Sequence, residues 1–76
     1  MNQIESDKPP IRLDQFLKLV AVAATGGHAK ILIQSEQVLV NGLVETKRRK
    51  QLNASDFVTV DDQTFLVAEH VDSIQE

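Results

Sequence analysis

The dipeptide Asn41-Gly42 stands between two short apolar runs, Val38-Leu39-Val40 and Leu43-Val44. Asn-Gly favours the two-residue turn of a type I′ β-hairpin, because both central residues of that turn adopt positive φ. A hairpin here divides the chain of 76 residues into two parts. The part before it has a helical pattern, and the part after it has the pattern of strands.

The stretch from Ile11 to Ala24 has the periodicity of an amphipathic helix. Pro10 disfavours helical backbone in the residue before it, so we expect the helix to begin after this proline. Apolar residues then follow at the i, i+3, i+4, i+7 spacing of one buried face. These residues are Leu13, Phe16, Leu17 and Val20, and Ala23 and Ala24 continue the face.

Thr25-Gly26-Gly27 is expected to end this helix, because paired glycines supply the positive φ of a C-cap. Thr25 or Gly26 can then cap a second helix from about Gly27 to Ser35. Two helices joined by so short a turn form a helical hairpin.

Beyond Asn41-Gly42, Leu52 is expected to anchor the chain to the core. Residues 57–60 and 64–67 read as two strands joined by a turn at 61–63. The sequence therefore predicts one α+β domain, a helical hairpin packed on a small antiparallel or mixed sheet over residues 11–70. A polar tail is expected at 1–10 and an acidic tail at 71–76.

The charges are segregated along the chain. All eight basic residues lie between Lys8 and Lys50, although the formal net charge is −3. Four are consecutive, Lys47-Arg48-Arg49-Lys50. The formally charged residues after Lys50 are all acids. A run of four charges is usually a solvated loop, but solvation alone does not predict this segregation. Since polyanions respond to local potential, the basic block is a candidate footprint for nucleic acid.

Motifs for catalysis and for metal binding are missing. The chain has no cysteine, which excludes a thiol nucleophile, a disulfide and a thiolate zinc site. No serine lies in a G-x-S-x-G elbow, and His28 and His70 lack metal-ligand spacing. We therefore expect no enzyme activity, no cofactor and no metal. Without a signal peptide or a membrane-length apolar run, a cytoplasmic protein is expected.

Residues 25–30, Thr-Gly-Gly-His-Ala-Lys, place glycines at a helix N-terminus, where unpaired backbone N–H groups attract anions. The spacing is not that of a phosphate-binding P-loop. A tight interhelical turn explains the glycines equally well, and such a turn also admits an RNA backbone. His28 is either a solvated first-turn residue or a phosphate contact.

The scarcity of aromatic residues indicates which kind of nucleic acid the chain would bind. Single-strand binders stack bases on aromatic side chains, whereas here only Phe16, Phe57 and Phe65 occur, at apolar-face positions. Phosphate and 2′-hydroxyl contacts to structured RNA fit this composition better than base stacking does. An acidic membrane fits less well, because no expected helix is both basic and strongly amphipathic.

These motifs occur in a recognisable order. Arg12-Leu13-Asp14, a helical hairpin, Ala29-Lys30 and Val40-Asn41-Gly42 with a basic stretch after it resemble the S-four RNA-binding domain. The resemblance covers about residues 11–60 and implies the alpha-L RNA-binding fold. The Thr-Gly-Gly turn and the Glu-Thr-Lys-Arg-Arg-Lys run at 45–50 are similar to those of the stand-alone bacterial group typified by YbcJ.

The resemblance implies an RNA surface that comprises Arg12, the start of the second helix and the basic residues after the Asn-Gly turn. Two departures concern this surface. Gly26-Gly27 replaces the Ser-Arg of many members, and Ser35-Glu36-Gln37 replaces a glycine before the first strand. The candidate RNA-binding residues are Arg12, Asp14, Gly26, Gly27, His28, Lys30, Asn41, Gly42, Lys47, Arg48, Arg49 and Lys50.

The expected function is non-catalytic binding of the backbone of structured RNA, with ribosomal RNA or the ribosome as partner and the protein as a monomer. The acidic C-terminal third would repel RNA and orient the domain. The alternative is an adaptor whose basic face docks an acidic protein on the ribosome or on another RNA-processing enzyme.

Overall fold

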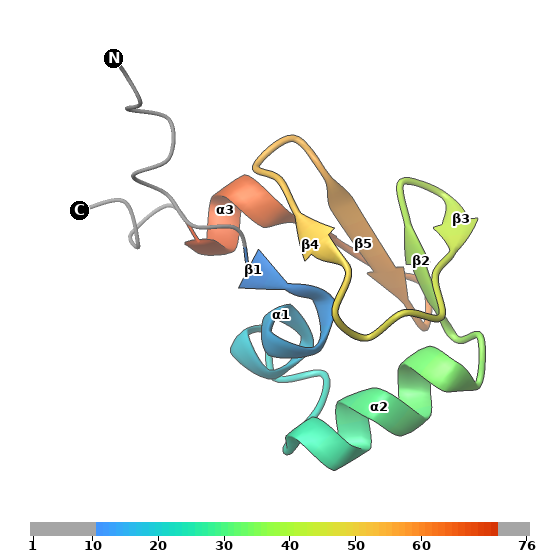
Figure 1. Ribbon diagram of the computed structural model, residues 1–76. Helices are drawn as coiled ribbons and strands as arrows, with labels where there is room; N and C mark the ends of the chain where they lie inside the picture. Colours follow the sequence, from blue (N-terminus) through green and yellow to red (C-terminus); the bar gives the residue numbers. More distant parts are fainter. Residues whose placement is uncertain (1–10, 72–76) are drawn as a thin grey trace.

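A short strand opens the part of the chain that the computed structural model describes, residues 11–71. The predicted tail at 1–10 and all but the first residue of that at 71–76 lie outside the described residues. Helices and strands form the predicted α+β architecture (Figure 1). The elements are β1 Ile11–Arg12, α1 Leu13–Leu19, α2 Gly26–Gln34, β2 Val38–Val40, β3 Leu43–Val44, β4 Gln51–Leu52, β5 Phe57–Val60, β6 Gln63–Leu66 and α3 Val67–Val71.

α1 is shorter than its periodicity predicts. It ends at Leu19, and Ala21 adopts a left-handed φ of 64°. The Ala21 N–H donates to the Lys18 carbonyl at 3.1 Å and the Val22 N–H donates to the Leu17 carbonyl at 3.0 Å. These two bonds form a Schellman motif, which closes a helix. The helix begins after Pro10, as expected, but β1 occupies Ile11 and Arg12, so the helical pattern starts two residues before the helix. The prediction that the helix continues to Ala24 is wrong.

The glycine pair does not end α1. Gly26 and Gly27 form the first turn of α2 instead, and of the described glycines only Gly42 has positive φ. The expectation that they act as a C-cap is wrong, because Ala21 already occupies the left-handed position. Of the two predicted caps, Thr25 or Gly26, Thr25 is the N-cap of α2: its Oγ1 accepts a hydrogen bond from the His28 N–H at 3.0 Å.

Four strands form an antiparallel sheet in the order β3-β2-β5-β6. The predicted Asn-Gly hairpin is confirmed, with φ of 53° at Asn41 and 85° at Gly42. The second hairpin has a tighter turn than predicted: Val60 pairs with Gln63, and only Asp61 and Asp62, both at positive φ, lie between them. Its second strand therefore begins and ends one residue early, and α3 starts at residue 67.

A separate two-stranded sheet was not anticipated from the sequence. β1 pairs antiparallel with β4, so that Ile11 lies opposite Leu52 and Arg12 opposite Gln51. Leu52 is 2% exposed and belongs to the core, as predicted. This pairing brings the start of α1 beside the chain segment that leads out of the basic run (Figure 1).

The core lies between the helices and one face of the larger sheet. Alternate sheet residues Val38, Val40, Val58 and Val60 point into it, as the two-residue period of strands requires. α1 and α2 lie together on that side (Figure 1). The core cluster also contains Leu13, Phe16, Leu17, Ala23, Ala29, Ile33, Leu52 and Val67.

Candidate nucleic-acid interface

The basic run, Lys47 to Lys50, forms a turn that rests on the first residues of α1. The Lys50 N–H donates to the Lys47 carbonyl at 3.0 Å, which closes the turn. The first N–H groups of a helix have no partner within the helix. Here the loop supplies two: Leu13 donates to the Lys50 carbonyl at 2.8 Å, and Asp14 donates to the Arg48 carbonyl at 3.0 Å.

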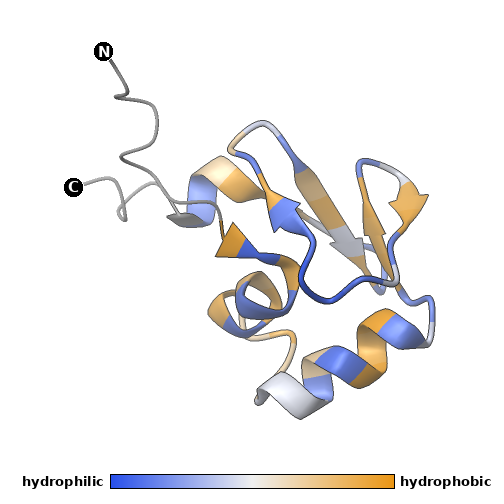
Figure 2. Cartoon of the chain, viewed as in Figure 1, coloured by the Kyte–Doolittle hydropathy of each residue, from blue (hydrophilic) through white to orange (hydrophobic). Residues whose placement is uncertain are grey.

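These hydrogen bonds between the loop and α1 are made by backbone groups only. The side chains of the loop can therefore face outward. Lys47, Arg49 and Lys50 are exposed, and Arg48 is half-buried. Figure 2 shows this segment as a mostly hydrophilic stretch that passes the start of α1. A fixed backbone with exposed cationic side chains is suited to contact with an extended anion.

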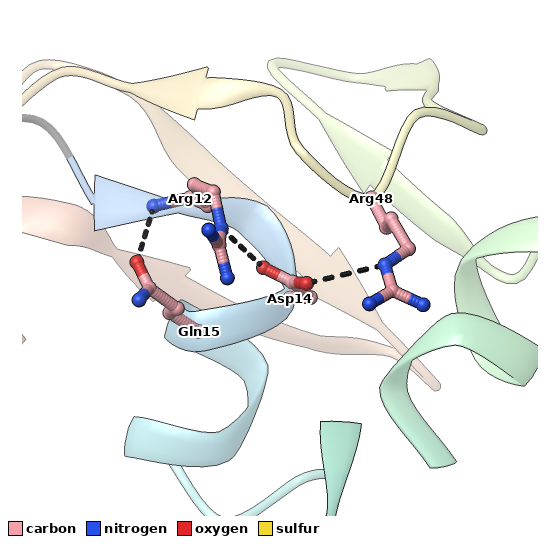
Figure 3. Close-up of polar contacts among 4 residues, drawn as sticks. All are labelled: Arg12, Asp14, Gln15 and Arg48. Carbon is pink, nitrogen blue, oxygen red and sulfur yellow. Dashed lines mark hydrogen bonds and ion pairs between the residues drawn. The ribbon is translucent and has the colours of Figure 1, made fainter. Parts of the chain in front are cut away.

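Asp14 joins the two arginines of the cluster. Its Oδ1 lies 3.2 Å from Arg12 Nε, and its Oδ2 lies 3.4 Å from Arg48 Nε. The carboxylate lies between the two guanidinium groups (Figure 3). The Asp14 side chain is 5% exposed, whereas those of Arg12 and Arg48 are 43% and 37% exposed. We call Arg12, Asp14 and Arg48 the arginine fork.

Gln15 supports the fork from the next position of α1. Its Oε1 accepts a hydrogen bond from the Arg12 N–H at 3.2 Å (Figure 3). This contact is the side-chain half of a capping box, in which the third helical residue reaches back to the N-cap. The backbone of Arg12 is thus fixed by Gln15 while its side chain is fixed by Asp14.

The start of α2 forms a second, separate group of candidate residues. His28 Nδ1 accepts a hydrogen bond from the Ala24 N–H at 3.3 Å. A ring nitrogen that accepts carries no proton, so the neutral ring has its N–H on Nε2. The His28 and Lys30 side chains are exposed. The exposed His28 ring and Lys30 can therefore donate to an anion.

The glycines at 26 and 27 are not explained by the fold. Apart from its chain neighbours and the adjacent helix backbone, a Cβ at Gly26 would meet no atom within 4 Å, and a Cβ at Gly27 would meet only Thr25 Oγ1, at 3.9 Å. Neither residue has positive φ. Packing and backbone conformation would therefore both accept alanine, a better helix former.

The Asn41 side chain makes hydrogen bonds to other residues of the protein. Its Nδ2 donates to Asp56 Oδ1 at 3.0 Å, and its Oδ1 accepts from the Phe57 N–H at 3.0 Å. Asp56 Oδ2 accepts from the Asn53 N–H at 2.8 Å. Asn41 thus ties the first hairpin to the turn before β5, and Gly42 is exposed beside it. The sequence pointed to Asn41 for its turn but contained no sign of Asp56 as partner.

Of the predicted site residues, the structure brings together Arg12, Asp14 and the basic run. Over residues 11–71, no hydrogen bond or ion pair joins this cluster to the start of α2 or to the Asn-Gly turn. No group of three or more His, Cys, Asp or Glu that could hold a metal ion occurs in the described part of the chain. Within the same residues no helix is long and apolar enough to cross a membrane.

Comparison with known proteins gives two matches. The sequence profile of the S4 domain matches residues 3–68. A curated relative, named a probable ribosome maturation protein RlbA, from Bacillus subtilis (strain 168), is 38% identical over 60 residues. The alignment covers 79% of this chain and 84% of the relative.

Proposed function

Because this chain belongs to the S4 (S-four) domain family, we propose that it binds structured RNA, and ribosomal RNA in particular, without catalysing a reaction. The relative named as a probable ribosome maturation protein supports a role connected with the ribosome. We propose residues 11–70 as the RNA-binding domain, acting as a monomer in the cytoplasm.

The observation that carries this proposal is the arginine fork with its basic run. Arg12 and Arg48 come from separate segments, yet both guanidinium groups meet at Asp14. Lys47, Arg49 and Lys50 are exposed on the same loop. Arginine binds phosphate well because the N–H donors of its planar guanidinium match the positions of the phosphate oxygens.

The mechanism is contact with the phosphate backbone rather than recognition of bases. Double-stranded RNA is bound mostly by shape, through phosphates and 2′-hydroxyls. Arg12, Arg48 and the exposed side chains of the basic run would neutralise phosphates. Lys30, His28 and the open glycine turn of α2 form a second contact, and Asn41-Gly42 contributes an exposed turn.

The direct test is crosslinking of the tagged full chain to RNA in cells, followed by sequencing of the bound RNA. A triple variant, Lys47→Ala, Arg49→Ala and Lys50→Ala, removes exposed charges and leaves Arg48 with Asp14. Lys18→Ala, an exposed change at the other end of α1, is the control. We expect enrichment of ribosomal RNA by the wild type and by Lys18→Ala, and much weaker enrichment by the triple variant.

Equal RNA recovery by the wild type and the triple variant would contradict the proposal. In that case the basic face would instead serve to dock an acidic protein. Such a complex would survive nuclease treatment, and Lys47→Glu with Arg49→Glu would abolish it.

A further inference from the structure

We infer that Asp14 is a positioning residue of the RNA interface, which holds Arg12 and Arg48 in the orientation that meets the phosphates. This inference rests on the proposed function. It assigns an acidic residue to a polyanion-binding surface, where a negative charge would otherwise weaken binding.

The burial of Asp14 is the first argument. Its side chain is 5% exposed, so the carboxylate has little access to water. A buried charge is costly unless it is paired. Arg12 supplies the partner for Oδ1 and Arg48 supplies the partner for Oδ2. If either guanidinium rotated away from Asp14, one buried carboxylate oxygen would lose its ion-pair partner.

The exposure of the arginines is the second argument. Their side chains remain 43% and 37% exposed, so they can still reach a ligand. A guanidinium has five N–H donors, and one carboxylate oxygen uses only a fraction of them. Each arginine can therefore be held by Asp14 and bind a phosphate at the same time.

The third argument is preorganisation. Long flexible side chains lose conformational entropy when a ligand orders them, and ordering them beforehand removes that cost from binding. Asp14 and Arg48 are joined twice, because the Asp14 N–H also donates to the Arg48 carbonyl at 3.0 Å. Backbone and side chain of Arg48 are thus both fixed relative to α1 before RNA arrives.

Asp14→Asn tests the inference, because the two possible roles of the carboxylate predict opposite signs. An asparagine keeps the shape and the backbone N–H, but an NH2 donor replaces one of the two carboxylate oxygens, so one of the two arginines loses its acceptor. Asp14 as a repulsive charge predicts that the variant binds purified ribosomal RNA more tightly. Asp14 as a positioning residue predicts binding weaker by roughly tenfold, the cost of ordering two arginine side chains.

A double-mutant cycle separates positioning from a failure to fold. Arg48→Lys keeps the charge but removes the Nε that meets Asp14. We expect this change to weaken RNA binding in the wild-type background and to have little further effect in Asp14→Asn. Equal weakening in both backgrounds, measured where both proteins are folded, would overturn the inference.

A measurement on the unaltered protein covers the case in which Asp14→Asn fails to fold. NMR relaxation of the arginine Nε–H groups reports the order of each side chain. Arg12 and Arg48 should be ordered without RNA and remain so with it, whereas the exposed Arg49 serves as the mobile reference. Arginines as mobile as Arg49 in the free protein would overturn the inference.

The outcomes distinguish this inference from the proposed function. If the wild-type chain does not bind ribosomal RNA, the proposed function fails first. If it binds and Asp14→Asn binds equally or more tightly, only the positioning role fails.

Discussion

Asn41 and Asp56 are linked side chain to side chain, with Asn41 Nδ2 donating to Asp56 Oδ1 at 3.0 Å. Asp56 is only 9% exposed and also accepts from the Asn53 N–H. Its carboxylate therefore closes the turn before β5 and joins that turn to the first hairpin.

Asp56→Ala should lower the free energy of unfolding by about 1–3 kcal/mol, because it leaves two donors in a partly buried site without their acceptor. Urea denaturation measures this. Glu69→Gln, an exposed change on α3, is the control and should stay within about 0.5 kcal/mol of the wild type. Similar midpoints for both variants would show that the Asp56 hydrogen bonds do not contribute to stability.

Ala21→Gly and Glu36→Gly should each stabilise the protein. Ala21 has φ of 64° and Glu36 has φ of 65°, and both occupy the left-handed position after a helix. This conformation costs a side-chain-bearing residue about 1–2 kcal/mol, against the roughly 0.5–1 kcal/mol that the flexibility of glycine costs. A net gain of up to about 1 kcal/mol should raise the thermal midpoint. Ala24→Gly, at an exposed residue without positive φ, should not raise it.

Thr25→Ala should destabilise the fold by about 1 kcal/mol, because it removes the acceptor for the His28 N–H at the start of α2. Thr25→Ser retains a hydroxyl and should restore most of that stability. Thermal denaturation of the two variants compares them directly. A serine variant no better than the alanine variant would show that the hydroxyl does not cap the helix.

Gly26→Ala should change stability and RNA binding in opposite directions. A Cβ there meets no atom within 4 Å beyond its chain neighbours and the adjacent helix backbone, so alanine should stabilise α2 by up to about 1 kcal/mol. If an RNA backbone approaches this turn, the same methyl group obstructs it and affinity falls. Gln34→Ala, at the exposed end of α2, controls for helix propensity. Unchanged affinity in Gly26→Ala would remove this turn from the interface.

RNA binding should depend steeply on salt. Neutralisation of about four to six phosphates of a duplex-like RNA gives a slope of log K against log salt of roughly −4 to −5. The triple variant at Lys47, Arg49 and Lys50 should make the slope shallower by about one for each phosphate that it no longer neutralises. A filter-binding titration at several salt concentrations measures both. A slope near zero for the wild type would contradict the electrostatic account.

Local chemistry predicted part of the fold. The Asn-Gly hairpin follows from the two turn residues alone, and Thr25 acts as the N-cap that its type favours. The end of α1 could not be found this way, because the apolar period continues through Val20 and Ala23. Those residues reach the core from the turn after α1, and periodicity does not distinguish the two arrangements.

The other elements could not be predicted from the sequence because they depend on pairing between distant segments. β1 and β4 have two residues each, too few for any strand pattern to appear. The charge segregation indicates the basic run, and the Arg-Leu-Asp motif indicates Asp14. Its burial between Arg12 and Arg48 depends on interactions between distant segments, which neither spacing nor composition encodes.

The pairing of β1 with β4 also links the proposed interface to the order of synthesis. Arg12 and Asp14 precede Arg48 in the chain, and β1, which contains Arg12, pairs with residues 51–52, which follow Arg48. A partly synthesised chain that stops short of Gln51 therefore has the charges of the interface without this strand pairing. If the chain binds RNA as proposed, RNA that binds only the folded state will stabilise that state by about 2.7 kcal/mol at a free concentration of one hundred times Kd.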